Sequence, residues 1–95
     1  MQFHLETDEL KLLANVLLEL DPVKYNAILI KVMAHDLRLD AGELEDSAAA
    51  LEIKKNSLKD EISREPNAAR KAEFERKLAL LVRTLERVNE ACVMF

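Results

Sequence analysis

The sequence predicts an all-α protein of four helices, in which a short N-terminal helix pair packs on the base of a long antiparallel helical hairpin. The first observation is compositional: 95 residues include one glycine and two prolines, fewer turn residues than a strand-rich fold needs. The second is a pair of apolar heptad stripes in the second half of the chain, typical of helices that pack along each other. The stripes are Ala41, Leu44, Ala48, Leu51, Lys55, Leu58 and Ile62, then Phe74, Leu78, Leu81, Leu85, Val88, Cys92 and Phe95.

The first predicted helix spans residues 8–20. Thr7 is expected as its N-cap, because a hydroxyl there can accept from the unpaired N–H groups of the first turn, and two acidic residues follow where they suit the helix dipole. Residues 2–6 alternate like a strand but have no partner strand. They are therefore expected to form an extended lead-in that packs Phe3 and Leu5 on the bundle.

The second predicted helix spans residues 22–38. Asp21 is the expected cap and Pro22 occupies the first helical position, where its missing N–H costs nothing. A broad apolar arc predicts that this helix is the most buried one or that it faces two partners. The arc consists of Tyr25, Ile28, Leu29, Ile30, Val32, Met33 and Leu37.

The third and fourth helices are predicted at residues 41–64 and 67–93. Asp40 and Glu43 have the spacing of a capping box at the start of the third helix. Between the two helices, Pro66-Asn67 forms the strongest stop signal in the chain. In an antiparallel hairpin with its turn at Pro66-Asn67, positions of the first stripe face positions of the second stripe. The stripes and the stop signal therefore predict the same register for the hairpin.

Residues 54–77 are predicted to project from the bundle as a two-helix arm. Their large apolar residues are all stripe members, whereas the base of the hairpin has additional apolar residues for a second layer. The arm is also basic. Residues 54–77 hold eight basic against five acidic side chains, while residues 1–53 hold four basic against eleven acidic ones, in a chain of net charge −4. The predicted partner-binding residues are Lys54, Lys55, Lys59, Arg70, Lys71, Arg76 and Lys77.

Three interpretations of the basic arm remain open. The charges can form a solvated helix surface held by intrahelical pairs. They can dock on the acidic body of a second copy, giving a homodimer that buries the exposed arm. They can also bind nucleic acid, although a net charge of +3 over residues 54–77, without interleaved aromatic residues, is weak for that purpose.

Lys55 is the one departure from the apolar stripe. One interpretation is that its stem packs at the edge of the seam while the ammonium group stays in water. The other is that its ammonium reaches Glu75 on the facing helix and fixes the register.

Catalytic and metal signals are poor. His4 and His35 have no partner at metal-ligand spacing, and Cys92 sits on the seam as a small apolar residue. An enzyme would need a polar pocket, for which Tyr25, His35 and Asp36 are the candidates. No cofactor, metal or catalytic residue is therefore predicted.

We expect a small cytoplasmic protein–protein interaction module that self-associates and has no catalytic activity, with a nucleic-acid-binding regulator as the alternative. The acidic N-terminus does not resemble a secretory signal, and a single cysteine fits a reducing compartment. The longest purely apolar run is far too short to span a bilayer, so no membrane partner is expected.

Overall fold

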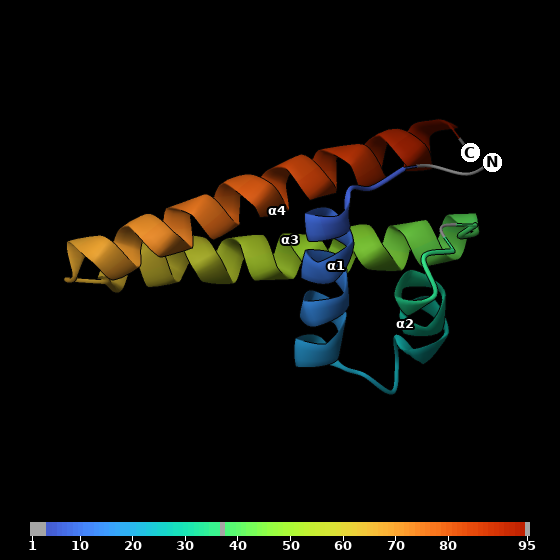
Figure 1. The fold of residues 1–95 in the computed structure, drawn as a ribbon, viewed down its shortest axis with the longest axis horizontal. Helices are drawn as coiled ribbons and strands as arrows, with labels where there is room; N and C mark the ends of the chain where they lie inside the picture. Colours follow the sequence, from blue (N-terminus) through green and yellow to red (C-terminus); the bar gives the residue numbers. More distant parts are fainter. Residues whose placement is uncertain (1–3, 37, 95) are drawn as a thin grey trace.

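The computed structural model describes residues 4–36 and 38–94, and these form four helices without a strand, as the sequence predicts (Figure 1). The two C-terminal helices make the most extensive contact and form the predicted hairpin. The predicted seam position Phe95 and the lead-in residue Phe3 lie outside the described residues. The helices are α1 (Thr7–Leu20), α2 (Asn26–Met33), α3 (Ala41–Arg64) and α4 (Ala68–Met94).

The hairpin of α3 and α4 begins and turns where the sequence predicts. The Asp40 carboxylate accepts a hydrogen bond from the N–H of Glu43 at 2.8 Å, while the Glu43 carboxylate accepts from the N–H of Asp40 at 3.0 Å, which completes the capping box. After the three-residue loop 65–67, the side-chain oxygen of Asn67 accepts from the N–H groups of Ala69 and Arg70 and caps α4. Residue-level signals thus set the position of the turn.

Large apolar residues of both stripes meet along the hairpin, but the burial is uneven. Leu44, Leu51 and Leu58 of α3 are at most 1% exposed, and Leu81 and Val88 of α4 are fully buried. Closer to the loop, the seam residues are only partly buried; these are Ile62, Phe74 and Leu78. The seam is therefore a core at the base and a half-open surface at the tip.

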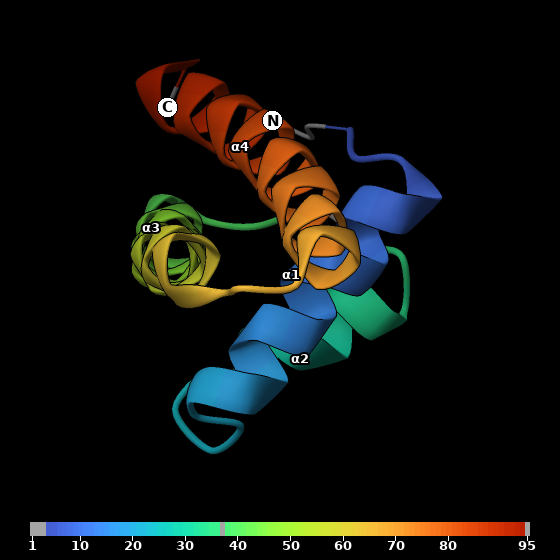
Figure 2. The ribbon, with the colours of Figure 1, turned by 90° about the vertical axis from the view of Figure 1, so that its left-hand side faces the viewer.

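Helix α1 crosses one side of the hairpin at a steep angle and contacts both of its helices, while α2 packs on α1 near the base (Figures 1 and 2). The side of the hairpin opposite α1 has no helix over it among the described residues (Figure 2). Small side chains are also buried beside the seam on both helices of the hairpin. They are Ser47 and Ala50 on α3 and Thr84 and Ala91 on α4.

The start of α1 corrects one sequence-based prediction. The N-cap is Glu6, and Thr7 is the first helical residue. The carboxylate of Glu9 accepts a hydrogen bond from the N–H of Glu6 at 2.9 Å. The hydrogen bond from the backbone of Glu6 to the Glu9 carboxylate is one half of a capping box. It makes α1 begin one residue earlier than it would if the Thr7 hydroxyl were the cap. Leu5 is 2% exposed, which confirms its predicted packing on the bundle.

Helix α2 is shorter than predicted at both ends. Asp21 does act as a cap, because its carboxylate accepts from the N–H groups of Val23 and Lys24. The residues that follow form a turn, and regular helix begins only at Asn26. The aspartate cap and the proline therefore start a turn that does not continue directly into the helix.

The other end of α2 stops at Met33 because the backbone of His35 enters the left-handed region, with φ of 57°. The N–H of Asp36 donates to the carbonyl of Lys31 at 2.8 Å, and that of His35 donates to the carbonyl of Val32 at 3.1 Å. These two bonds form a Schellman ending. Glycine usually occupies the left-handed position, so histidine gave no stop signal in the sequence.

Of the two alternatives predicted for α2, the first, that it is the most buried helix, is wrong. One side of α2 packs on the core through buried side chains. On the other side, Ile30 is 61% exposed and Met33 is 66% exposed, and Val23 in the preceding turn is 85% exposed. The broad apolar arc thus covers the core with one half and leaves the other half in solvent. The buried residues are Ile28, Leu29 and Val32, together with Tyr25 just before the helix.

Candidate interaction surfaces

Lys54 does not lie on the uncovered part of the hairpin. Its side chain is 11% exposed and its ammonium group donates to the carboxylate of Glu19 on α1 at 2.9 Å. The pair fastens α1 across α3 at the helix crossing. The uncovered arm, which we define as residues 59–80, begins beyond this pair.

The side chain of Lys55, the lysine in the apolar stripe, stays on its own helix. Its ammonium group pairs with Glu52 of the same helix at 2.9 Å, and the side chain is 22% exposed. The proposed reach to Glu75 across the seam is not made. Lys55 is a seam-edge lysine with a packed stem and an ion pair on its own helix.

The remaining predicted partner-binding residues are exposed on or near the uncovered arm. Arg70 lies 3.9 Å from Glu65, a long ion pair across the loop, and Arg64 pairs with Asp60 one turn earlier. Four other cations have no ion pair with the described residues: Lys59, Lys71, Arg76 and Lys77. Without Lys54, residues 55–77 carry seven basic and five acidic side chains. This balance leaves little net charge for a phosphate backbone.

A shallow hollow lies at the tip of the uncovered arm. It has a volume of about 310 Å³ and combines the ring of Phe74 with a rim of both charge signs. An aromatic ring bordered by charged groups is common in protein–protein contacts. The lining residues are Asp60, Glu61, Arg64, Glu65, Arg70 and Phe74.

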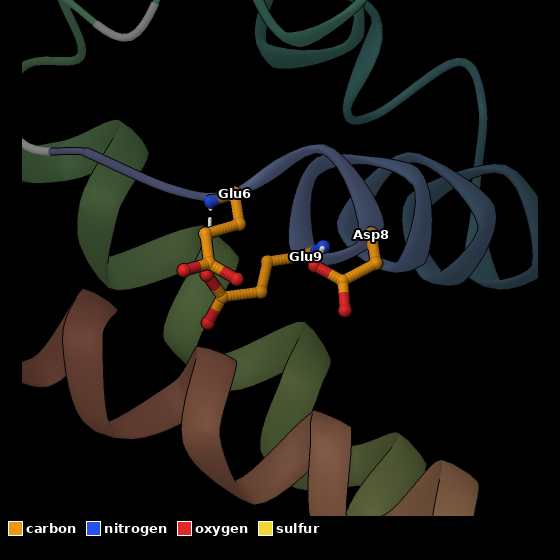
Figure 3. Close-up of side chains that lie close together, drawn as sticks. All are labelled: Glu6, Asp8 and Glu9. Carbon is orange, nitrogen blue, oxygen red and sulfur yellow. Dashed lines mark hydrogen bonds between the residues drawn. The ribbon is translucent and has the colours of Figure 1, made fainter.

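Three carboxylates gather at the start of α1, where Glu6, Asp8 and Glu9 lie close together (Figure 3). Glu9 is fully buried, an unusual place for a carboxylate unless it is paired. Two arginines of α4 supply the pairing. The Nε atom of Arg83 lies 3.3 Å from the Glu9 carboxylate, and that of Arg87 lies 3.2 Å from it.

The same arginines account for the rest of this acidic cluster. A terminal nitrogen of Arg83 lies 3.1 Å from the Asp8 carboxylate and 3.8 Å from that of Glu6. Positive groups therefore already face all three carboxylates, and the cluster is an ionic junction that ties the start of α1 to α4. The sequence analysis missed it, although the i,i+4 arginine pair on α4 and the Glu6–Glu9 spacing were available signals.

An open groove runs between α1 and α2, with a volume of about 400 Å³. Its walls are mainly apolar, and its exposed parts include Leu18 at 47% and Met33 at 66%. Polar groups lie along its length and at its end. The lining residues are Thr7, Leu10, Lys11, Ala14, Asn15 and Leu18 from α1, Val32 and Met33 from α2, and His35 after it.

The residues considered for catalysis do not meet in one polar pocket. Tyr25 is 5% exposed within the core, His35 lies at the groove, and Asp36 forms a two-point contact with the guanidinium of Arg38. Cys92 is partly buried against the core, and burial together with the nearby Glu45 carboxylate raises the pKa of its thiol. A raised thiol pKa suits a packing role better than nucleophilic chemistry.

No protein-family model, no curated protein and no solved structure matches the chain. Among the described residues, none of the four helices has the length and apolar character that crossing a membrane requires. The uncovered arm and the α1–α2 groove are therefore the features that bear on function.

Proposed function

We propose that the chain is a self-associating helical protein–protein interaction module without catalytic activity of its own. The observation that carries the proposal is the half-open seam of the uncovered arm. Ile62, Phe74 and Leu78 are partly exposed, whereas the same stripes are buried at the base of the hairpin. A two-helix arm is marginal alone, so covering it with a second copy would stabilise it.

The side of the hairpin opposite α1 is the available surface for this contact (Figure 2). A turn of 3.6 residues places Lys59 about 140° around α3 from Lys54, which faces α1. Lys59 therefore points to the side without a covering helix. The same periodicity places Lys71 about 160° around α4 from Arg87, which faces α1, so Lys71 also points towards that side.

Charge favours an antiparallel arrangement of the two hairpins. The base of the hairpin carries exposed carboxylates that form no ion pair with the described residues, among them Glu45 and Glu86. The arm carries exposed lysines that also form no ion pair with the described residues, among them Lys59 and Lys71. An antiparallel two-fold would set the acidic base of one copy against the basic arm of the other. A parallel pairing would juxtapose like charges, which costs affinity.

Sedimentation velocity over a concentration series tests the proposal. We expect the wild-type chain to shift from monomer to dimer in the micromolar range, and the dimer to weaken as salt screens its charges. The K59E/K71E variant should dimerise roughly 10-fold less tightly, because both changes place carboxylates against an acidic base. Adding E45K and E86K to that variant exchanges the signs on both sides and should restore the dimer.

Lys11→Glu is the matched control, since Lys11 is an exposed cation on α1, away from the arm. It should leave the dimer constant unchanged. A wild-type chain that stays monomeric with intact helical circular dichroism contradicts the proposal. A four-site variant that does not recover contradicts the antiparallel arrangement.

A further inference from the structure

The walls of the groove between α1 and α2 consist mainly of apolar side chains. Leu10, Ala14 and Leu18 line one wall, and Val32 and Met33 line the other. The apolar surface continues around α2, where Ile30 is 61% exposed one turn before Met33. Contiguous exposed apolar surface of this kind marks a docking site more often than an unused face.

The ionisable groups that line this groove are both bases, in a chain with an excess of four negative charges. They are Lys11 in the middle of α1 and His35 at the end of the α2 wall. Lys11 has no ion pair with the described residues.

All three carboxylates of α1, the helix that carries Lys11, are held by cations of other helices. Asp8 and Glu9 of α1 pair with arginines of α4, and Glu19 pairs with Lys54 of α3. Asp36, next to His35, is held by Arg38. The groove therefore presents the positive charge of Lys11, which no carboxylate of the described residues neutralises.

We propose that the α1–α2 groove is a docking site for an amphipathic helix of a partner protein, with acidic residues beside the apolar stripe of that helix. The uncompensated charge of Lys11 selects a partner with acidic residues, and the apolar walls of the groove select the apolar stripe of its helix. This site is separate from the hairpin surface of the self-association proposal and does not depend on it.

The α1 wall of the groove is long enough to run along a bound helix. From Thr7 to Leu18, α1 rises about 17 Å, enough to contact three turns of a bound helix. Ala14 lies midway along this wall, and its small side chain allows close approach of a partner. In this binding mode, side chains at i, i+3 or i+4 and i+7 of the incoming helix fill the groove.

The probe is a pair of synthetic helical peptides with the same leucine stripe, one carrying glutamates beside the stripe and the other carrying lysines at those positions. Fluorescence anisotropy measures their affinity for the full chain, and NMR shifts of the Met33 methyl group report occupancy of the groove. We expect the glutamate peptide to bind roughly 3- to 10-fold more tightly than the lysine peptide. Lys11→Glu should abolish or reverse that preference.

Two variants separate the groove from the rest of the molecule. Met33→Asp should weaken binding of both peptides, because it places a charge in the apolar wall, whereas Lys71→Glu on the arm should change neither affinity. Equal affinity for the two peptides, or an unchanged preference in Lys11→Glu, overturns the proposal. So does a Met33 methyl shift that depends on protein concentration without peptide, since a second copy would then occupy the groove.

Discussion

At the scale of single residues, the hydroxyl of Ser47 is buried on α3 without a hydrogen-bond partner among the described residues. A buried hydroxyl without a partner loses its hydration and gains nothing in return. We expect Ser47→Ala to raise the free energy of unfolding by about 1 kcal/mol, part of it from helix propensity. Urea denaturation measures this change.

Thr84 is the control for this residue. Its hydroxyl donates to the carbonyl of Leu80 at 2.8 Å and is equally buried. Thr84→Ala should therefore lower the free energy of unfolding, opposite in sign to Ser47→Ala. A clear loss of stability in Ser47→Ala would show that its hydroxyl has a favourable interaction in solution.

The backbone conformation of His35 also affects the stability of the fold. Its left-handed backbone ends α2, and a side chain is strained there while glycine is not. We expect His35→Gly to stabilise the fold by about 0.5–1 kcal/mol and His35→Val to destabilise it, because a β-branched residue tolerates this region poorly. Thermal unfolding followed by circular dichroism gives both signs, and the same sign for both variants would contradict the account.

At the scale of elements, the junction of α1 with α4 depends on Glu9. Its buried carboxylate faces Arg83 and Arg87 and also accepts from the N–H of Glu6. Glu9→Gln removes the ion pair of Arg87 and one of the three carboxylates that face Arg83, so we expect a loss of about 1–3 kcal/mol of unfolding free energy. Asp8→Asn, at a half-exposed neighbour, should cost less than about 0.5 kcal/mol.

The link between α2 and α3 has a pH signature. The ammonium group of Lys31 donates to the Glu43 carboxylate at 2.7 Å, and this bond raises the pKa of Lys31 above its ordinary value of 10.5. A raised pKa stabilises the fold at pH values below 10.5, and the stabilisation disappears as the pH rises through the higher folded-state pKa. The stability difference between wild type and Lys31→Gln should thus be constant near neutral pH and shrink in alkali.

Sequence patterns predicted the long elements better than the short ones. The stripes, the Asp40 capping box and the Pro66-Asn67 stop signal are local, and each gave a correct boundary for the hairpin. The end of α2 was missed, since it depends on a histidine in a backbone region that glycine normally occupies.

The ion-pair partners of charged side chains were harder to predict than the ends of the long helices. The pairing of Lys54 with Glu19 depends on where α1 crosses the hairpin, and no local pattern contains that information. The α1–α2 groove escaped prediction for a related reason. An apolar arc in the sequence does not show which half of it the fold will cover.

At the scale of the whole molecule, two surfaces of different character lie on different helix pairs. The uncovered hairpin combines a half-open apolar seam with a division of charge along its length. The α1–α2 groove combines apolar walls with uncompensated positive charge. The proposal of self-association rests on the first surface, and the proposal of partner docking rests on the second.

The distance between the two arm tips of a dimer tests this account most directly. A spin label on Ser63→Cys, in a Cys92→Ser background, marks the loop end of the arm, and double electron–electron resonance measures the label separation. Antiparallel overlap of 24-residue helices puts the two tips about 36 Å apart. That distance is the result we predict, while the absence of an intermolecular distance, or one well below 20 Å (roughly four helical turns) as in a parallel pairing, would contradict it.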